Sequence, residues 1–153
     1  MLGRMFALLL AAAVTDPCAL LTAEEIEKVQ GEKPAQAKPS LRETGDLRDE
    51  QCFYQLPTFA RSISLEVMRG KGARELWRKS FKERHEEDDE EEEKPERVRG
   101  LGEEAYWSGG LRLGGLYVLK KDAVVRLSVG GPEKKEAKLK KLRLLAKRVL
   151  SRL

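Results

Sequence analysis

The pattern of apolar and polar residues predicts strands in both halves of the chain. Within residues 62–68, apolar residues at 63, 65 and 67 alternate with polar residues at 62, 64 and 66, so three apolar side chains share one face of a strand. Residues 116–120 and 123–129 are mostly apolar, with Val125, Leu127 and Val129 on one face. Lys121 and Asp122 between the two segments are typical of a hairpin turn. The 62–68 strand should lie on the core, and this hairpin is the clearest sheet element of the C-terminal half. Shorter strands are predicted at 51–55 and 103–107.

The segment 33–49 lacks such a pattern. It contains Pro34, Pro39 and Gly45 and shows little periodicity. We therefore expect a loop there, with a single strand around 40–44.

Helical spacing appears at both ends and in the middle of the chain. Thr22 and Glu25 form a capping box, with Leu21 and Ile26 as a hydrophobic staple, and Gly31 can end the helix in a left-handed conformation. A second helix is expected at 73–84, covering the sheet through the side chains of Leu76, Trp77 and Phe81.

The C-terminal residues predict a long helix, with Pro132 at its first position. One stripe is apolar and should pack across the sheet: Leu139, Leu142, Ala146, Val149 and Leu153. The remaining faces are strongly basic: Lys134, Lys135, Lys138, Lys140, Lys141, Arg143, Lys147, Arg148 and Arg152. Together the elements predict a single α+β domain over residues 16–153, in which an antiparallel sheet is packed by an N-terminal, a middle and a long C-terminal helix.

The first residues have the layout of a secretory signal. A positively charged start at 1–4 precedes an apolar run at 5–14, and Ala11 and Ala13 favour cleavage after residue 13. Cleavage ahead of Asp16 and a buried N-terminal helix remain alternatives. The run is about half the length that a membrane-spanning helix needs. We therefore predict a signal peptide at 1–13 and a periplasmic or secreted protein.

Export determines how the cysteines are interpreted. Cys18 and Cys52 are the only two in the chain. In an oxidising compartment an isolated pair most simply forms one disulfide. A redox-active pair is the alternative, but the chain has no Cys-x-x-Cys motif to lower a thiol pKa.

Composition and charge narrow the function classes. The 153 residues include one histidine and two cysteines, which argues against a four-ligand zinc site. The formal charge of +4 is unevenly spread, because eight consecutive acids occupy 86–93 and leave a basic body. That acidic segment, a loop or a helix end, lacks the glycine and the ligand spacing of an EF-hand calcium loop. We expect no cofactor or metal.

The other candidates for chemistry are weak. Glu103 and Glu104 are adjacent in an expected strand, which would direct them to opposite faces. His85 has no serine or cysteine motif beside it, and the glycines between 100 and 115 do not form a phosphate-binding fingerprint. No catalytic residue is predicted.

The basic C-terminal helix permits two interpretations. Its cations are either the solvated covering of a packed helix or a surface for anionic membranes or nucleic acid. The helix has no aromatic residue for base stacking, which does not favour nucleic acid. The solvated covering is the preferred interpretation.

Several short motifs resemble a known group of proteins. They are the 16–22 stretch around Cys18, the later Cys52-Phe53-Tyr54, the 102–107 stretch and the hairpin at 116–129. The chain resembles the small exported bacterial domains of unknown function that open with Cys-x-Leu-Leu-Thr. The resemblance implies an α+β fold and bacterial export, and it implies little about activity.

The sequence thus leads to three functional hypotheses. The preferred one is a non-enzymatic binding module whose partner is a protein or small ligand of the cell envelope. A membrane-surface protein held by the basic helix is the second. An enzyme is the third, and it would need a cleft with converging titratable groups.

Overall fold

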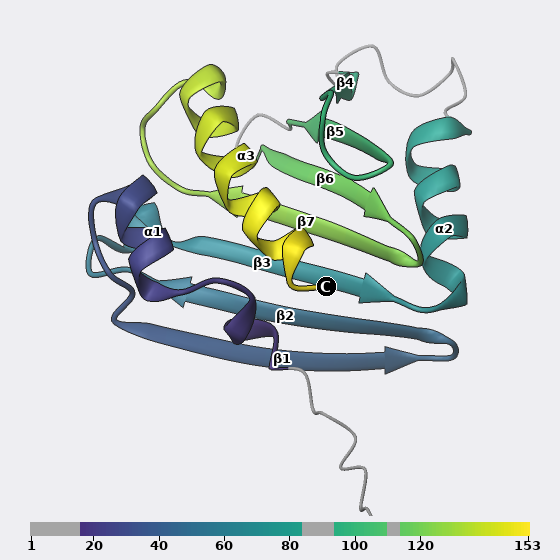
Figure 1. Cartoon of the computed structure of the whole chain (residues 1–153), viewed down its shortest axis with the longest axis horizontal. Coiled ribbons are helices and arrows are strands. Elements are labelled where there is room, and N and C mark those ends of the chain that lie inside the picture. Colours follow the sequence, from purple (N-terminus) through teal and green to yellow (C-terminus); the bar gives the residue numbers. More distant parts are fainter. Residues whose placement is uncertain (1–15, 84–93, 110–113) are drawn as a thin grey trace, which may run out of the picture.

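The computed structural model describes residues 16–83, 94–109 and 114–153, and these form one antiparallel sheet of seven strands. The predicted signal peptide, the acidic segment 86–93 and His85 lie outside the described residues. In sheet order the strands run β1-β2-β3-β7-β6-β5-β4 (Figure 1). Their bounds are β1 Gln36–Thr44, β2 Leu47–Gln55, β3 Ile63–Arg69, β4 Glu96–Arg97, β5 Glu104–Ser108, β6 Gly115–Lys120 and β7 Ala123–Val129.

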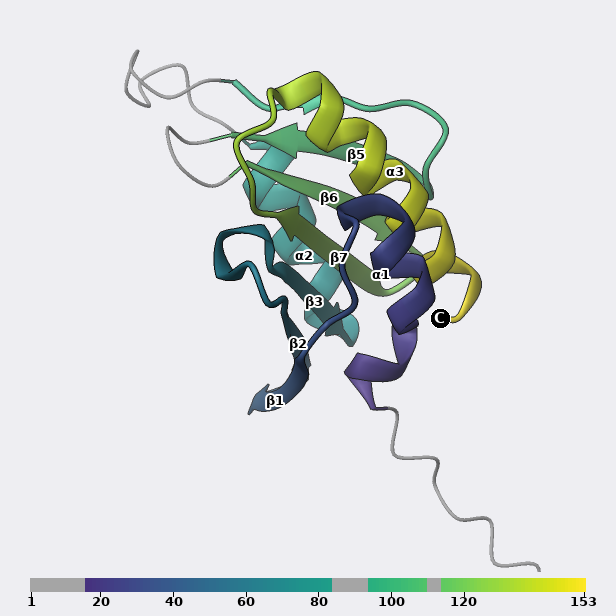
Figure 2. The ribbon, with the colours of Figure 1, turned by 90° about the vertical axis from the view of Figure 1, so that its left-hand side faces the viewer.

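Helices lie on both faces of this sheet. α1 (Ala23–Gln30) and α3 (Lys135–Ser151) pack on one face, and α2 (Lys71–Trp77) lies on the other (Figures 1 and 2). α2 continues into the π-helical turn η3 (Arg78–Lys82), and two short 3-10 turns, η1 (Pro17–Leu20) and η2 (Phe59–Arg61), precede α1 and β3. The fold is α+β with the predicted arrangement of helices.

The main core lies between the sheet and the pair α1 and α3. Ile63, Leu65 and Val67 of β3 are each at most 1% exposed and face α3 and α1, as the alternation predicted. From α3 the buried residues are Leu142, Leu145, Ala146, Val149 and Leu150, whereas Leu139 and Leu153 are only partly buried at its ends. The apolar stripe is therefore wider than the one read from the sequence.

Two details of the predicted helices are wrong. α3 begins at Lys135, with Lys134 as its N-cap, so Pro132 still belongs to the connection that leaves β7 through Gly130 and Gly131. The side chain of Leu76 is 36% exposed, because the face that meets the sheet carries Ala73, Trp77 and Phe81, which are spaced four residues apart.

The single strand expected around 40–44 lies within β1, but the rest of the expected loop at 33–49 is wrong, because β1 and the start of β2 occupy most of it. Every residue of β1 is exposed. An edge strand with both faces in solvent has no reason to alternate in polarity, which removes the sequence signal. Pro39 is accommodated because an edge strand has one side free of ladder hydrogen bonds.

The ends of α1 follow the sequence. The Thr22 hydroxyl accepts a hydrogen bond from the backbone N–H of Glu25 at 3.2 Å. Gly31, with φ of +79°, ends the helix and donates its N–H to the carbonyl of Glu27. The Glu25 carboxylate, however, binds the Arg152 guanidinium, which also donates to the Leu20 carbonyl at 2.9 Å. This contact joins the two ends of the described chain.

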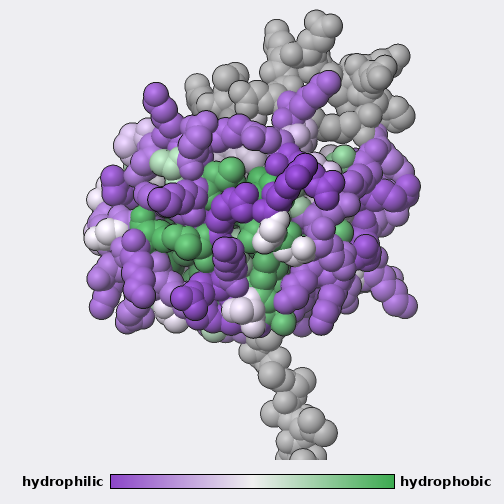
Figure 3. All heavy atoms as spheres, turned by 45° about the horizontal axis from the view of Figure 1, so that its top comes forward, coloured by the Kyte–Doolittle hydropathy of each residue, from purple (hydrophilic) through white to green (hydrophobic). Residues whose placement is uncertain are grey.

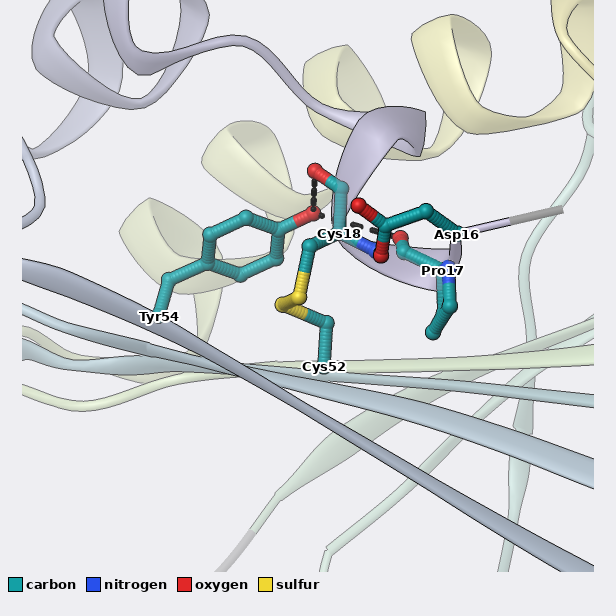
Figure 4. The surroundings of a disulfide bond; sticks show 5 residues. All are labelled: Asp16, Pro17, Cys18, Cys52 and Tyr54. Carbon is teal, nitrogen blue, oxygen red and sulfur yellow. Dashed lines mark hydrogen bonds between the residues drawn. A yellow bond between two sulfur atoms is a disulfide. The ribbon is translucent and has the colours of Figure 1, made fainter. Parts of the chain in front are cut away.

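A disulfide attaches the first turn of the described chain to the sheet. Cys18 of η1 and Cys52 of β2 are bonded, with their Cα atoms 5.1 Å apart (Figure 4). Beside them the Tyr54 hydroxyl donates to the Cys18 carbonyl at 2.9 Å, and the Asp16 carboxylate accepts from the Cys18 N–H. Such a bond is compatible with an oxidising compartment. None of the helices formed by the described residues has the length and apolarity that crossing a membrane requires.

Candidate binding hollow

The face of the sheet that carries α2 is only partly covered. α2 crosses one end of the strands β2, β3 and β7, and η3 lies over β5 and β6, where Phe81 stacks on Tyr106 with ring centroids 4.9 Å apart. Figure 2 shows that α2 stands on the opposite side of the sheet from α1 and α3. Towards the other end of the strands, Phe53, Ser64 and Ser128 point to the α2 side and remain half-buried.

A hollow of about 520 Å³ lies at that end of the sheet. Its wall includes Phe59 and Ala60 of η2 and the connection Gly130–Pro132, and Lys138 of α3 borders it. Phe59 is 65% exposed, and its ring centroid lies 5.9 Å from that of Phe53. An exposed aromatic ring beside a second ring is the feature that makes this hollow a candidate for binding.

Two other hollows of comparable size are less suited to a ligand. The residues that line one, of about 440 Å³, all come from the continuous segment 97–104. A second, of about 370 Å³, lies between η1 and β1. The hollow at Phe53 and Phe59 is the largest of the three and joins segments from β2, η2, β3, β7 and α3. Such convergence of distant segments is typical of binding sites.

The walls of this hollow are held firmly. Gly130 donates its N–H to the Ser62 carbonyl at 3.0 Å. A Cβ atom at Gly130 would lie 1.9 Å from the Ala60 carbonyl oxygen, so only glycine permits this approach. The buried Gln30 amide donates to the carbonyls of Arg61 and Gly130 at 2.7 and 3.2 Å. η2 and the β7–α3 connection are thus tied together.

An ion-pair network lies behind the same wall. Lys141 donates to the Gln30 side-chain oxygen at 2.7 Å and to the Glu133 carboxylate at 3.0 Å. Arg61 lies 3.6 Å from that carboxylate. The hydrogen bond from Lys141 lowers the pKa of Glu133. Glu133 is therefore ionised and already neutralised by two cations.

A row of polar residues crosses the same sheet face next to the hollow. Register pairs Gln51 with Glu66, Glu66 with Arg126 and Arg126 with Tyr117. Arg126 donates to the Tyr117 hydroxyl at 2.9 Å and lies 3.9 Å from the Glu66 carboxylate. Burial raises the pKa of Glu66, and the neighbouring Asp49 raises it further.

No family model matches the sequence, and a search of the curated proteins finds no match. Among solved structures, a crystal structure of a GTP binding regulator from Thermotoga maritima is similar over 87% of this chain and 90% of that chain. The sequence identity is 9% and the TM-score is 0.47. This similarity is too low to carry any statement about function.

The raised pKa of Glu66 makes stability depend on pH. The folded state binds the Glu66 proton more tightly than the unfolded chain does, and this tighter binding stabilises the folded state. The stabilisation is fully present below the ordinary pKa of 4.5 and is lost as the pH rises through the raised pKa. We expect Glu66→Gln to gain unfolding free energy relative to the wild type as pH rises from 4.5 to about 7. Urea unfolding at several pH values measures this, with the exposed Glu43→Gln as control. A constant or shrinking difference would contradict it.

The two glutamates considered for acid–base chemistry, Glu103 and Glu104, do not line this hollow. The expected placement of Glu103 and Glu104 on opposite faces of a strand is wrong, because Glu103 precedes β5 and both carboxylates contact side chains of α2. The Glu103 carboxylate accepts from Arg74 at 2.7 Å, and that of Glu104 accepts from Trp77 Nε1 at 3.1 Å. These contacts fasten α2 to the sheet. Within the parts of the chain that the structure describes, no group of three or more metal-ligating residues is found.

Sequence reasoning missed the residues that define the hollow. Phe53 lies in a predicted strand, and no pattern in the sequence marks Phe59. The available signal was an aromatic residue in the short segment 56–62 between strands, directly after Pro57 and Thr58. An apolar ring in such a connection either packs inward or serves an interface, and Phe59 remains exposed.

Proposed function

We propose that the protein is an exported, non-enzymatic binding module whose site is the hollow at Phe53 and Phe59. The observation that carries the proposal is the 65% exposure of Phe59 at the mouth of a hollow of about 520 Å³. Leaving so large an apolar ring in water costs free energy that a bound ligand would recover. The hydrogen bonds of Gln30 and Gly130 hold this site in shape before any ligand arrives.

Export is part of the same proposal. Support comes from the signal-like pattern of residues 1–14, from the Cys18–Cys52 disulfide, and from the resemblance to small exported bacterial domains. Intact-mass analysis of protein isolated from its native host should find a chain that begins near Val14 or Asp16. Recovery of the full-length chain from the cytosol would contradict export.

The structure argues for this proposal over the membrane-surface hypothesis. The apolar stripe of α3 lies against the sheet, with Leu142 and Val149 fully buried. A bilayer would therefore meet lysines, arginines and the 53% exposed Leu144 rather than the stripe. Figure 3 shows this side of the molecule as a mainly hydrophilic surface with hydrophobic residues between the polar ones.

A fragment screen by protein-observed NMR tests the site. We expect amide shifts caused by bound fragments to concentrate at Phe53, Phe59, Ser64 and Ser128, and Phe59→Ala to abolish most of them. Leu144→Ala is the matched control, because it also removes an exposed apolar side chain. Hits that gather elsewhere, or that survive in Phe59→Ala, would contradict the proposal.

A further inference from the structure

We propose that the ligand of this hollow is a small amphipathic anion, a flat apolar ring system that carries a carboxylate or a similar acidic group. The inference rests on the proposed function and adds the chemical class of the ligand. Its evidence is the joint placement of two aromatic rings, two serines and one lysine around the hollow.

The rings of Phe53 and Phe59 define the apolar half of the site. Their planes are tilted by 55°, so they form two sides of a wedge rather than a flat stack. A planar ring placed against one of them meets the edge of the other, and tilted or offset contacts are favourable for aromatic pairs. The carbon atoms of Pro132 and Val129 extend the apolar lining. A flat apolar group fits this half better than a flexible chain does, because a rigid group loses little conformational freedom when it binds.

The charge of the site favours an anion. Among the described residues that line the hollow, Lys138 alone is charged. Its ammonium group has no ion-pair partner among the described residues, while Glu133 is neutralised by Lys141 and Arg61. The N-terminus of α3, one turn before Lys138, has no side-chain cap, and the partial positive charge of that end adds to the potential. A cation would find no acidic group in the described lining.

The serines give the acidic group neutral donors. Ser64 and Ser128 are cross-strand partners on the α2 side of the sheet, and both line the hollow. A hydroxyl rotates to donate to an anion and keeps its acceptor sites for water. The hollow, at about 520 Å³, lies within the range of small-molecule sites.

Three probes of one shape and different charge test the inference. They are naphthalene-2-carboxylate, 2-naphthalenemethanol and 2-naphthylmethylammonium, titrated into the full mature protein at neutral pH by NMR. We expect the carboxylate to bind about three- to fivefold tighter than the alcohol, because its ion pair with Lys138 would be partly exposed to solvent. The ammonium probe should bind weakest. Lys138→Gln should remove the preference by lowering the affinity for the carboxylate. Phe59→Ala should weaken the carboxylate and the alcohol alike, by up to about tenfold.

Lys147→Gln and Leu144→Ala serve as controls, because both change exposed residues of α3 away from the hollow. Equal affinity of the carboxylate and the alcohol, or a preference that persists in Lys138→Gln, would overturn the anion assignment while the hollow remains a binding site. If no probe shifts Phe53 or Phe59 at millimolar concentration, or if Phe59→Ala changes nothing, the site itself is wrong and the proposed function fails with it.

Discussion

Removing the disulfide should lower the free energy of unfolding by about 3 to 4 kcal/mol. The bond closes a loop of 34 residues that contains α1 and β1, so it removes many conformations from the unfolded chain. It also fixes η1 over β2, where Tyr54 holds the Cys18 carbonyl. The double variant Cys18→Ala/Cys52→Ala is preferable to serine, because Cys52 is 1% exposed and a serine would bury a hydroxyl.

Urea unfolding of the wild type with and without reductant, beside the double alanine variant, measures this effect. Reductant should destabilise the wild type and leave the variant unchanged, because the variant has no bond to lose. A loss below about 1 kcal/mol in both comparisons would mean that η1 is held to the sheet by its other contacts alone.

Leu142→Ala should cost about 2 to 5 kcal/mol of unfolding free energy. The side chain is fully buried between α3 and the sheet, so the substitution removes apolar contacts and leaves a cavity. Leu144→Ala is the matched control in the same helix. Its side chain is 53% exposed, and alanine slightly favours helix, so we expect a change within about 0.5 kcal/mol.

Chemical denaturation of both variants gives the two values, and circular dichroism shows whether the helix content is kept. A similar loss for both variants would contradict the orientation of α3. A larger loss for Leu144→Ala would mean that its outer face, rather than the stripe containing Leu142, contacts the rest of the protein.

Much of the fold could be predicted because burial is one-sided in most elements. β3 has one face against α1 and α3 and the other half-exposed, which produces the alternation of Ile63, Leu65 and Val67. Thr22 and Gly31 mark the ends of α1 through local backbone chemistry that needs no tertiary information. β1 escaped prediction for the opposite reason, since an edge strand exposed along its whole length carries no burial pattern.

The candidate site could not be predicted in the same way. Phe53, Ser64 and Ser128 become neighbours only through the register of β2, β3 and β7, and Lys138 joins them only because α3 crosses the sheet from that end. The local pattern of apolar and polar residues predicts neither the strand register nor the path of α3. The exposure of Phe59 follows from the anchoring of η2 by Gln30 and Gly130, whose contacts span up to 100 residues of sequence.

The most direct test of the binding site is to locate a bound probe. Intermolecular nuclear Overhauser effects between naphthalene-2-carboxylate and the protein report which side chains the ring touches. The proposed site predicts contacts from the naphthalene protons to the ring protons of Phe53 and Phe59. The two ring protons next to the carboxylate, H1 and H3, should contact the side-chain methylene protons of Lys138. Contacts confined to Leu144 and Val29, in the shallow depression between α1 and α3, would contradict it.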